Sequence, residues 1–574
     1  MAIGIPEQAA EMIKLRLRRL RPLLIGFLIL YIFRLWYLQI YHGSYYKTYS
    51  EKYRIRSERV IANRGLILDR NGTVLVENRP YFHLLIVPED CSDWESLEHN
   101  LVQILPNRTQ HISEQLSQAQ KAFPYLPFTI ASDLSFSEVV QIEARSIDIP
   151  GVRISYEAKR FYPYGERAGH LIGYMGKITL LEWQVLKNDE HLRFRKHNLI
   201  GKSGIEKIFN DQLTGFPRDI TFEADAQGRR IEILTPVELR SPIPGHDIYL
   251  TLDWELQMFI ENIFKEFTGA VVVMNPNDGD ILAMVNRPSF DPNLFSVGIS
   301  VDDWKNLIND QKHPLINRSL QSAYSPGSIF KIITATAGLN KGLISPAKTH
   351  NCLGRAKFLG DWRSCWKSGG HGKMNLHRAI VNSCNIYFFN AAIAIGIDNI
   401  ATTSREFGLG QRTNIQLPHE ERGLIPTPEW KERVLHQPWW RGETLSVAIG
   451  QGSVLTTPIQ LVRMISAIAN GGAVLVPRII KTIGQDQSIQ PKMAGKLKLS
   501  PEILTFIQAS LKGVVNEDGG TARRVQIPDI TVAGKTGTTQ VVTKEITAKY
   551  GREIPHKYRD HNWFVGYAPY EEPQ

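Results

Sequence analysis

The sequence predicts an α+β protein that one N-terminal helix holds in a membrane. An apolar run at 22–41 follows a basic cluster near the N-terminus. Short segments beyond it alternate apolar and polar side chains around Asn/Gly turns, which is typical of β-hairpins. The second half opens with another such segment at 269–292, continues with long helical patterns, and returns to strand character near residue 531. Strands that enclose a block of helices indicate an α+β fold rather than alternating β/α units.

Length and composition limit the classes of protein. The chain has 574 residues, which is enough for several domains. With 43% hydrophobic and 22% charged residues it is globular rather than disordered. The net charge of +10 would suit nucleic acid, but "KLRLRRLR" at 14–21 holds five of the cations beside the apolar run. Four cysteines are too few for a disulfide scaffold.

The apolar run predicts an uncleaved membrane anchor. About 20 residues suffice to cross a bilayer as a helix. Arg34 lies in its second half and can extend toward the interface. Aromatic residues follow the run and no small-residue cleavage site does, which disfavours a signal peptide. Because basic residues precede the span, we expect the N-terminus in the cytoplasm. The remaining chain would lie outside the cytoplasmic (inner) membrane, in the periplasm or another extracytoplasmic space, away from the genome.

The chain divides into four predicted parts. Residues 1–21 form a cytoplasmic basic tail and residues 22–41 the transmembrane helix. Residues 42–244 begin with a hairpin around Asn71-Gly72, followed by a mostly helical stretch and then by turns and short strands. Residues 245–574 hold the second hairpin and the helical block, with a long helix beginning near Ser328.

Three short strings occur in order in the second half: "SIFK" from Ser328 to Lys331, "SCN" from Ser383 to Asn385, and "KTGT" from Lys535 to Thr538. A serine hydroxyl is a weak nucleophile until a base removes its proton. A lysine three positions further lies on the same helix face. Burial and a second cation would lower its pKa and leave it neutral. S-x-x-K occurs at four places and K-[ST]-G at three, so the order of the strings matters more than any one of them.

This ordered triple resembles the penicilloyl-serine transferase superfamily, which includes penicillin-binding proteins and serine β-lactamases. "RGLILDRNGTVL", "GKSGIEKIFNDQLTG" and "GQGSVLTTPIQL" are similar to further stretches of class B penicillin-binding proteins, most of all the elongation-specific type, penicillin-binding protein 2. The resemblance implies a β-rich, non-catalytic pedestal of the dimerisation type at 42–244. It implies a transpeptidase domain at 245–574, with an antiparallel sheet flanked by helices.

The resemblance also implies a function. It is peptidoglycan D,D-transpeptidation during cell elongation and rod-shape maintenance, with penicillin binding and a D,D-carboxypeptidase side activity. Ser328 would attack D-alanyl-D-alanine and carry the acyl group, with Lys331 as its base. Ser383 would relay the proton and Asn385 hold the substrate amide. The residues expected to bind the terminal carboxylate are Lys535, Thr536, Gly537 and Thr538, and the backbone N–H groups of Ser328 and Thr538 would form the oxyanion hole.

A candidate metal site lies beside these strings. Cys352, Cys365, His371 and Cys384 offer three thiolates and an imidazole, which suit structural zinc. A Cys352–Cys365 disulfide and free buried thiols are the alternatives. For catalysis itself we expect no cofactor.

We expect peptidoglycan stem peptides on lipid-linked nascent glycan as substrates and β-lactams as inhibitors. The chain shows no glycosyltransferase domain, so a multi-span glycosyltransferase of the elongation machinery is the expected partner. The chain ends at "WFVGYAPYEEPQ", where the resembling proteins continue with another strand and a helix. We therefore expect a transpeptidase domain truncated at its C-terminus. Two other functions stay open: a non-catalytic cell-wall scaffold, and a β-lactamase or β-lactam sensor.

Overall fold

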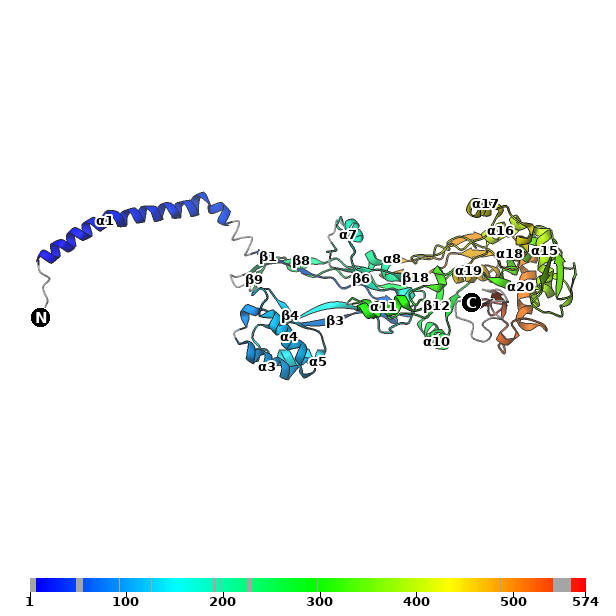
Figure 1. Ribbon diagram of the computed structural model, residues 1–574, viewed down its shortest axis with the longest axis horizontal. Coiled ribbons are helices and arrows are strands. Elements are labelled where there is room, and N and C mark those ends of the chain that lie inside the picture. The colour runs from blue at the N-terminus through cyan, green and yellow to red at the C-terminus, as the bar shows by residue number, and fades with distance from the viewer. Residues whose placement is uncertain are drawn as a thin grey trace. The chain divides into compact units, whose positions relative to one another are not determined.

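The computed structural model describes most of the chain (Figure 1). The described ranges are 7–47, 55–91, 93–124, 126–188, 193–196, 198–224, 230–296, 298–485, 487–539 and 559–574. The chain forms two compact units, Met1–Asn63 with Gly215–Pro244, and Arg64–Thr214 with Gly245–Gln574. The four-part division made from the sequence stays a prediction.

The first unit contains the predicted anchor. Helix α1 runs from Glu7 to Trp36 and continues as a π-helical turn over Tyr37–Tyr41. Its apolar stretch, Leu20–Tyr41, has a mean hydropathy of 1.9 and none of it is buried against protein. This single apolar helix suits a single-pass membrane anchor. The unit also holds an antiparallel sheet of three strands, β1 (Ile55–Val60), β8 (Arg218–Ala224) and β9 (Arg230–Ile233).

The hairpin predicted around Asn71-Gly72 is present in the second unit. Strand β2 (Ile67–Leu68) pairs antiparallel with the long strand β3 (Val74–Ile86). Two further strands pair with β3, namely β4 (Phe128–Leu134) and β5 (Val152–Phe161). The helices expected between them are α3 (Trp94–Ile104), α4 (Thr109–Ala119) and α5 (Phe136–Ala144). Their apolar faces enclose one buried cluster together with Leu84 of β3.

One sheet joins distant parts of the chain. Strand β10 (Ile248–Leu250) pairs parallel with β2 and antiparallel with β18 (Ile480–Ile483), which pairs with β19 (Gln487–Ser488). The strand order is β19-β18-β10-β2-β3-β4, with β5 also on β3. Residues 169–213 form α6 (Gly169–Ile172), β6 (Met175–Lys177), α7 (Leu180–Leu186), β7 (Leu199–Gly201), α8 (Gly204–Ile208) and α9 (Asn210–Leu213).

The second predicted hairpin is also present, as β11 (Gly269–Met274) and β12 (Ile281–Arg287), after helix α10 (Trp254–Phe264). The KTGT string lies on β21 (Ala533–Thr539), which pairs antiparallel with β22 (His561–Tyr567). The prediction of one antiparallel sheet needs correction, because among the described residues these are two separate ladders. Helix α19 (Pro458–Ala469) contacts both β11 and β22, so the ladders share a helix instead of backbone hydrogen bonds.

The helical block forms the largest buried cluster, which includes Phe330, Ile333, Phe388, Leu461 and Val514. Its helices are α11 (Val301–Asn309), α12 (Arg318–Gln321), α13 (Lys331–Asn340), α14 (Leu376–Val381), α15 (Asn385–Ile395), α16 (Ile397–Glu406), α17 (Pro428–Leu435), α18 (Arg441–Val447), α19 and α20 (Pro501–Asn516). Three small ladders accompany them: β13 (His350–Cys352) with β16 (Gly372–Met374), β14 (Arg355–Phe358) with β15 (Asp361–Ser364), and β17 (Ala473–Leu475) with β20 (Met493–Lys496).

Candidate active site

Ser328 lies in a 3₁₀ turn, Gly327–Phe330, that leads directly into helix α13. Its neighbour Gly327 has φ +55°, and a Cβ there would lie 2.8 Å from the carbonyl oxygen of Thr538. Only glycine allows the turn to approach the KTGT strand this closely. The turn therefore presents a half-buried serine between the start of a helix and a strand edge.

Lys331 joins the first two predicted strings. Its side chain is fully buried, and Nζ donates to the carbonyl oxygen of Ser383 (2.8 Å), to Ser383 Oγ (3.1 Å) and to Asn385 Oδ1 (2.7 Å). These contacts use all three protons of an ammonium group. Burial lowers the pKa of Lys331 to about 8, so a neutral amine is within reach near neutral pH.

Ser383 is held in an unusual backbone conformation. Its φ is +53°, and it follows Asn382, the C-cap residue of helix α14. The N–H of Ser383 donates to Ile380 O and that of Cys384 donates to Ala379 O, as in a Schellman motif. Glycine is the usual residue at this position, because a side chain there is strained. In this conformation the Ser383 hydroxyl accepts a hydrogen bond from Lys331 Nζ.

The KTGT strand is fastened to the residues before Ser328. Thr539 Oγ1 donates to Ser325 O at 2.8 Å, and Trp563 Nε1 donates to the same oxygen at 3.2 Å. A Cβ on Gly537 would lie 2.8 Å from Pro326 O, which explains the glycine in this string.

The four residues of the KTGT string differ in exposure. Lys535 is fully buried, and burial together with the charge of Lys331 lowers its pKa well below the usual value. Gly537 is buried, Thr536 is half-buried and shares a 2.7 Å hydrogen bond with Thr521, and the Thr538 side chain is exposed. The structure thus presents a threonine to solvent beside two buried amines.

One expected contact is missing. Within the part of the chain that the structure describes, Ser328 Oγ has no hydrogen-bond partner, and Lys331 bonds to Ser383 and Asn385 instead. Catalytic hydrogen bonds often form only when substrate is bound. The structure therefore brings Lys331, Ser383 and Asn385 together and leaves Ser328 one helical turn away.

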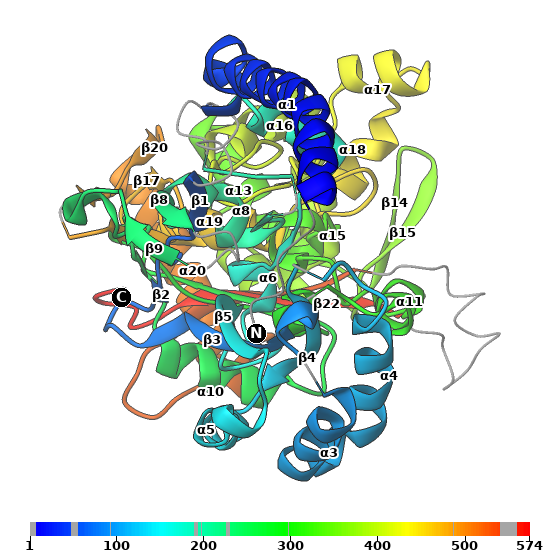
Figure 2. The ribbon, with the colours of Figure 1, turned by 90° about the vertical axis from the view of Figure 1, so that its left-hand side faces the viewer.

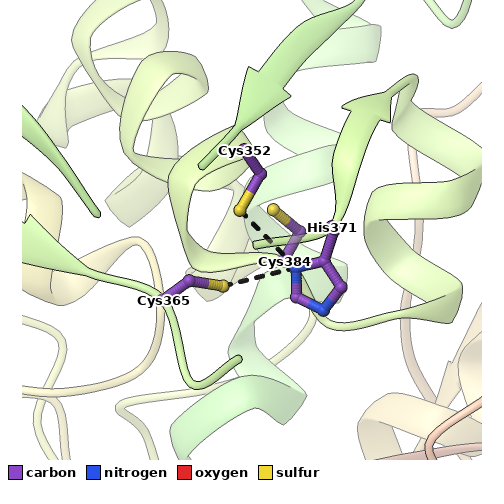
Figure 3. A group of neighbouring side chains, drawn as sticks. All are labelled: Cys352, Cys365, His371 and Cys384. Atoms are coloured by element: carbon purple, nitrogen blue, oxygen red, sulfur yellow. Dashed lines mark hydrogen bonds between the residues drawn. The ribbon is translucent and has the colours of Figure 1, made fainter. Parts of the chain in front are cut away.

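The four predicted metal ligands form a cluster beside this site (Figure 3). Their ligand atoms all lie within 4.8 Å of one another. His371 Nδ1 lies 3.6 Å from Cys352 Sγ and 3.5 Å from Cys365 Sγ. Ligands placed tetrahedrally at usual zinc distances would be about 3.6 Å apart for S and N. A hydrogen bond from Cys384 lowers the pKa of Cys365 to about 4, which favours a metal-binding thiolate. The cluster could therefore hold a metal ion.

Sequence reasoning missed two features of the site. One is the pair of hydrogen bonds from Thr539 and Trp563 to Ser325, which join residues far apart in the chain. The other is the β14–β15 hairpin between two metal ligands. Its signal in the sequence is weak, since the "LG" turn at 359–360 replaces the Asn-Gly or Asp-Gly that marks a tight hairpin.

The comparisons with known proteins agree with this geometry. Residues 269–574 match the penicillin binding protein transpeptidase domain, and residues 59–250 match the penicillin-binding protein dimerisation domain. The peptidoglycan D,D-transpeptidase MrdA of Acinetobacter baumannii is 35% identical over 543 residues, covering 94% of this chain and 80% of that protein.

Two solved structures are also similar. The complex between penicillin-binding protein PBP2 and MreC from Helicobacter pylori has a TM-score of 0.75 and 27% identity, covering 91% of this chain and 93% of that one. A structure described as the coordination of polymerization and crosslinking by a peptidoglycan synthase complex has a TM-score of 0.72 and 29% identity, covering 97% and 92%. The chain therefore belongs to the penicillin-binding protein family, in its PBP2 or MrdA type. Members of this type are peptidoglycan D,D-transpeptidases of cell elongation, and this chain is an enzyme of that class.

Proposed function

We propose that this transpeptidase works through an acyl-enzyme on Ser328. The observation that carries the proposal is the contact of the buried Lys331 amine with both Ser383 and Asn385, one helical turn from Ser328. Ser328 Oγ attacks the carbonyl carbon of the penultimate D-alanine as its proton passes to neutral Lys331. The peptide bond breaks, D-alanine leaves with a proton relayed through Ser383, and the peptide remains as an ester on Ser328.

The other predicted residues bind the substrate in this proposal. Asn385 holds the amide of the donor peptide. Lys535, Thr536, Gly537 and Thr538 receive its terminal carboxylate, since a buried lysine and an exposed threonine on one strand suit an anion that arrives from solvent. The backbone N–H groups of Ser328 and Thr538 stabilise the oxyanion. An amine of a neighbouring stem peptide then attacks the ester, which forms the cross-link and frees Ser328. Water in place of that amine gives the carboxypeptidase side reaction.

Purified full-length protein and uncross-linked glycan strands test this function. The wild type is expected to release D-alanine and to form cross-linked dimeric peptides, and Ser328→Ala is expected to form neither. Cross-linking by the Ser328→Ala variant would rule out Ser328 as the nucleophile.

The cysteine–histidine cluster is proposed to bind structural zinc. Cys384 is both a ligand and the middle residue of the SCN string, so the metal would fix the backbone between Ser383 and Asn385 without entering the reaction. Elemental analysis should find about one zinc ion per chain, since three thiolates and one imidazole form a complete tetrahedral set. Mass analysis without reductant that finds a Cys352–Cys365 disulfide and no metal would favour the alternative.

The proposed orientation places the N-terminus in the cytoplasm and both further domains, 42–244 and 245–574, in the periplasm, because cations precede the span. Expected partners are a multi-span glycosyltransferase and an MreC-like protein, by similarity to the two solved assemblies. Protease added to the outside of spheroplasts should remove everything beyond residue 41. If residues 42–574 were protected from the protease, the chain would have the opposite orientation in the membrane.

A further inference from the structure

The β14–β15 hairpin lies beside the active site and has no part in the mechanism above. Figure 2 shows it extending from the body of the domain near α18. Its side chains alternate between two faces, as in any strand pair. On the inner face Phe358 is buried, with its ring 5.5 Å from that of Phe389. Packing thus fixes one face of the hairpin and leaves the other exposed.

The outer face combines an indole with cations. Trp362 is 60% exposed, and the Arg355 guanidinium lies 4.3 Å from its ring. Lys357 is the cross-strand partner of Trp362 and is also exposed. The surrounding segment, 351–374, holds five Lys and Arg residues and a single acid, Asp361. Such a face suits an anionic ligand that also offers a flat apolar surface, such as the ring of a sugar.

Arg363, on the inner face, has one guanidinium nitrogen without a hydrogen-bond partner among the described residues. It is half-buried, and its Nε is shielded from solvent without a hydrogen-bond partner. Among the described residues it forms no ion pair. Its terminal nitrogen lies 3.7 Å from the place that a Cβ on Gly442 of α18 would take. Polar atoms that are buried without a partner are rare in native proteins. The Nε of Arg363 therefore lacks an acceptor, and a carboxylate is the acceptor that best suits a guanidinium group.

The base of the hairpin is joined to the catalytic residues. The carbonyl oxygen of Ser364, the last residue of β15, accepts from Asn385 Nδ2 at 3.4 Å. Trp366 Nε1 donates to Asn382 O at 3.1 Å. Cys365, which lies between Ser364 and Trp366, belongs to the same cysteine–histidine cluster as Cys384. A ligand on the hairpin would therefore lie in a fixed relation to Asn385.

We propose that the β14–β15 hairpin binds the acceptor substrate, an uncross-linked saccharide strand whose peptides end in free carboxylates. Trp362 and Arg355 contact the strand, and Arg363 pairs with a peptide carboxylate. The strand is thereby positioned so that its amine reaches the ester on Ser328. The positive charge of the hairpin and the negative charge of the peptide termini are complementary. This inference rests on the proposed function and adds a substrate-binding role to a segment outside the three strings.

Three measurements on the full-length protein in detergent test the proposal. They are binding of soluble uncross-linked peptidoglycan strands, the KM and kcat of cross-linking, and the rate of acylation by penicillin. Trp362→Ala and Arg363→Gln are each expected to weaken strand binding about tenfold, since each removes a stacking or charge-assisted contact. KM for the strand should rise more than kcat falls, and acylation should change much less than binding. Trp362→Phe and Arg363→Lys should recover most of the binding.

Matched controls are Trp304→Ala, another exposed tryptophan, and Arg145→Gln, an exposed arginine of the first half. Both should bind strands as the wild type does. Strand binding that is unchanged in the hairpin variants would overturn the proposal. So would a loss of acylation as large as the loss of binding, because it would show a purely structural role. A wild type that penicillin does not acylate would instead refute the Ser328 mechanism, since strand binding needs no acylation.

Discussion

At the scale of single residues, the proposed mechanism depends on the buried amine of Lys331. Its three contacts with Ser383 and Asn385 satisfy the ammonium form, yet the general base must be the neutral form. Burial resolves this conflict, because desolvation lowers the pKa to about 8.

This pKa predicts the pH dependence of acylation. The reactive form is deprotonated, so the rate constant for acylation by penicillin should rise about tenfold per pH unit below pH 8 and level off above it. Stopped-flow acylation between pH 5.5 and 9.5 measures the profile. A rate that falls as the pH rises through 8 would exclude Lys331 as the base.

A second prediction concerns the strained Ser383. Ser383→Ala and Ser383→Gly both remove the hydroxyl and should slow acylation equally. The glycine variant should be more stable than the alanine variant by about 1 kcal/mol, because only alanine keeps a Cβ at positive φ. Thermal unfolding of the two proteins gives the difference. Equal stabilities would contradict the assigned strain.

Short strings were enough to predict the catalytic candidates, because the chemistry requires particular residue types at fixed spacings. The contact of Lys331 with the Ser383 carbonyl could not be predicted, since a backbone atom carries no signal in the sequence. The sequence also could not predict that Ser328 Oγ lacks a hydrogen bond to Lys331, because the side-chain rotamer depends on packing that only the structure shows.

At the scale of elements, the cysteine–histidine cluster brings together four positions of the segment between α13 and α15. His371 suits a test of this cluster, because its substitution leaves the SCN string, which contains Cys384, unchanged. Between Cys352 and His371 the chain has only short strands and few buried apolar side chains, so a metal would supply much of the order of this stretch.

We therefore predict that His371→Ala reduces bound zinc and slows acylation. Mutation of residues that only hydrogen-bond to metal ligands lowers metal affinity by at least about tenfold. Loss of His371, which would bind the metal directly, should lower the affinity for zinc by more than that. Metal content and acylation are measured on the same preparation, with the exposed His99→Ala as control. Full activity of a zinc-free protein would show that the cluster is not needed to hold the SCN string in place.

Alternating apolar and polar residues around Asn/Gly or Asn/Asp/Gly turns were enough to predict the hairpins β2–β3 and β11–β12. The pairing of the ladders did not, because alternation marks a strand without naming its partner. The parallel contact of β2 with β10 joins residues about 180 positions apart, and no local pattern indicates it. The same limit explains why one continuous antiparallel sheet was predicted where two ladders share α19.

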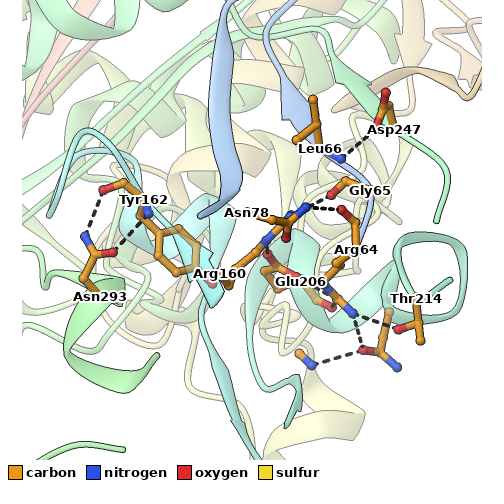
Figure 4. A network of polar contacts seen from close by, with 12 residues as sticks. Arg64, Gly65, Leu66, Asn78, Arg160, Tyr162, Glu206, Thr214, Asp247 and Asn293 are labelled. Carbon is orange, nitrogen blue, oxygen red and sulfur yellow. Dashed lines mark hydrogen bonds and ion pairs between the residues drawn. The ribbon is translucent and has the colours of Figure 1, made fainter. Parts of the chain in front are cut away.

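At the scale of the whole second unit, a buried ionic network holds its segments together (Figure 4). Glu206 accepts from Arg64 Nε and Arg160 Nε, both at 2.7 Å. Burial alone would raise the pKa of Glu206, but the two guanidinium groups outweigh it, so that the pKa is lowered. Nearby, Asp247 accepts from the backbone N–H of Leu66, and the Asn293 side chain bonds to the backbone of Tyr162. The contacts of Asp247 and Asn293 connect residues 64–214 with the catalytic half.

Glu206→Gln should destabilise this unit strongly. Two buried guanidinium groups would lose their counter-charge, and breaking such a group by removing one partner costs about 3–5 kcal/mol. Urea unfolding measures the change, with the exposed Glu157→Gln as control. A loss below about 1 kcal/mol, typical of surface pairs, would show that the network is not structural.

The proposed mechanism requires acylation of Ser328, and intact mass spectrometry detects that acyl group. Full-length protein and its Ser328→Ala variant would each be incubated with a penicillin and weighed. We predict one penicilloyl group on the wild type, none on the variant, and the adduct on the peptide that contains Ser328. A folded wild type without an adduct, or a variant that still gains one, would contradict the account.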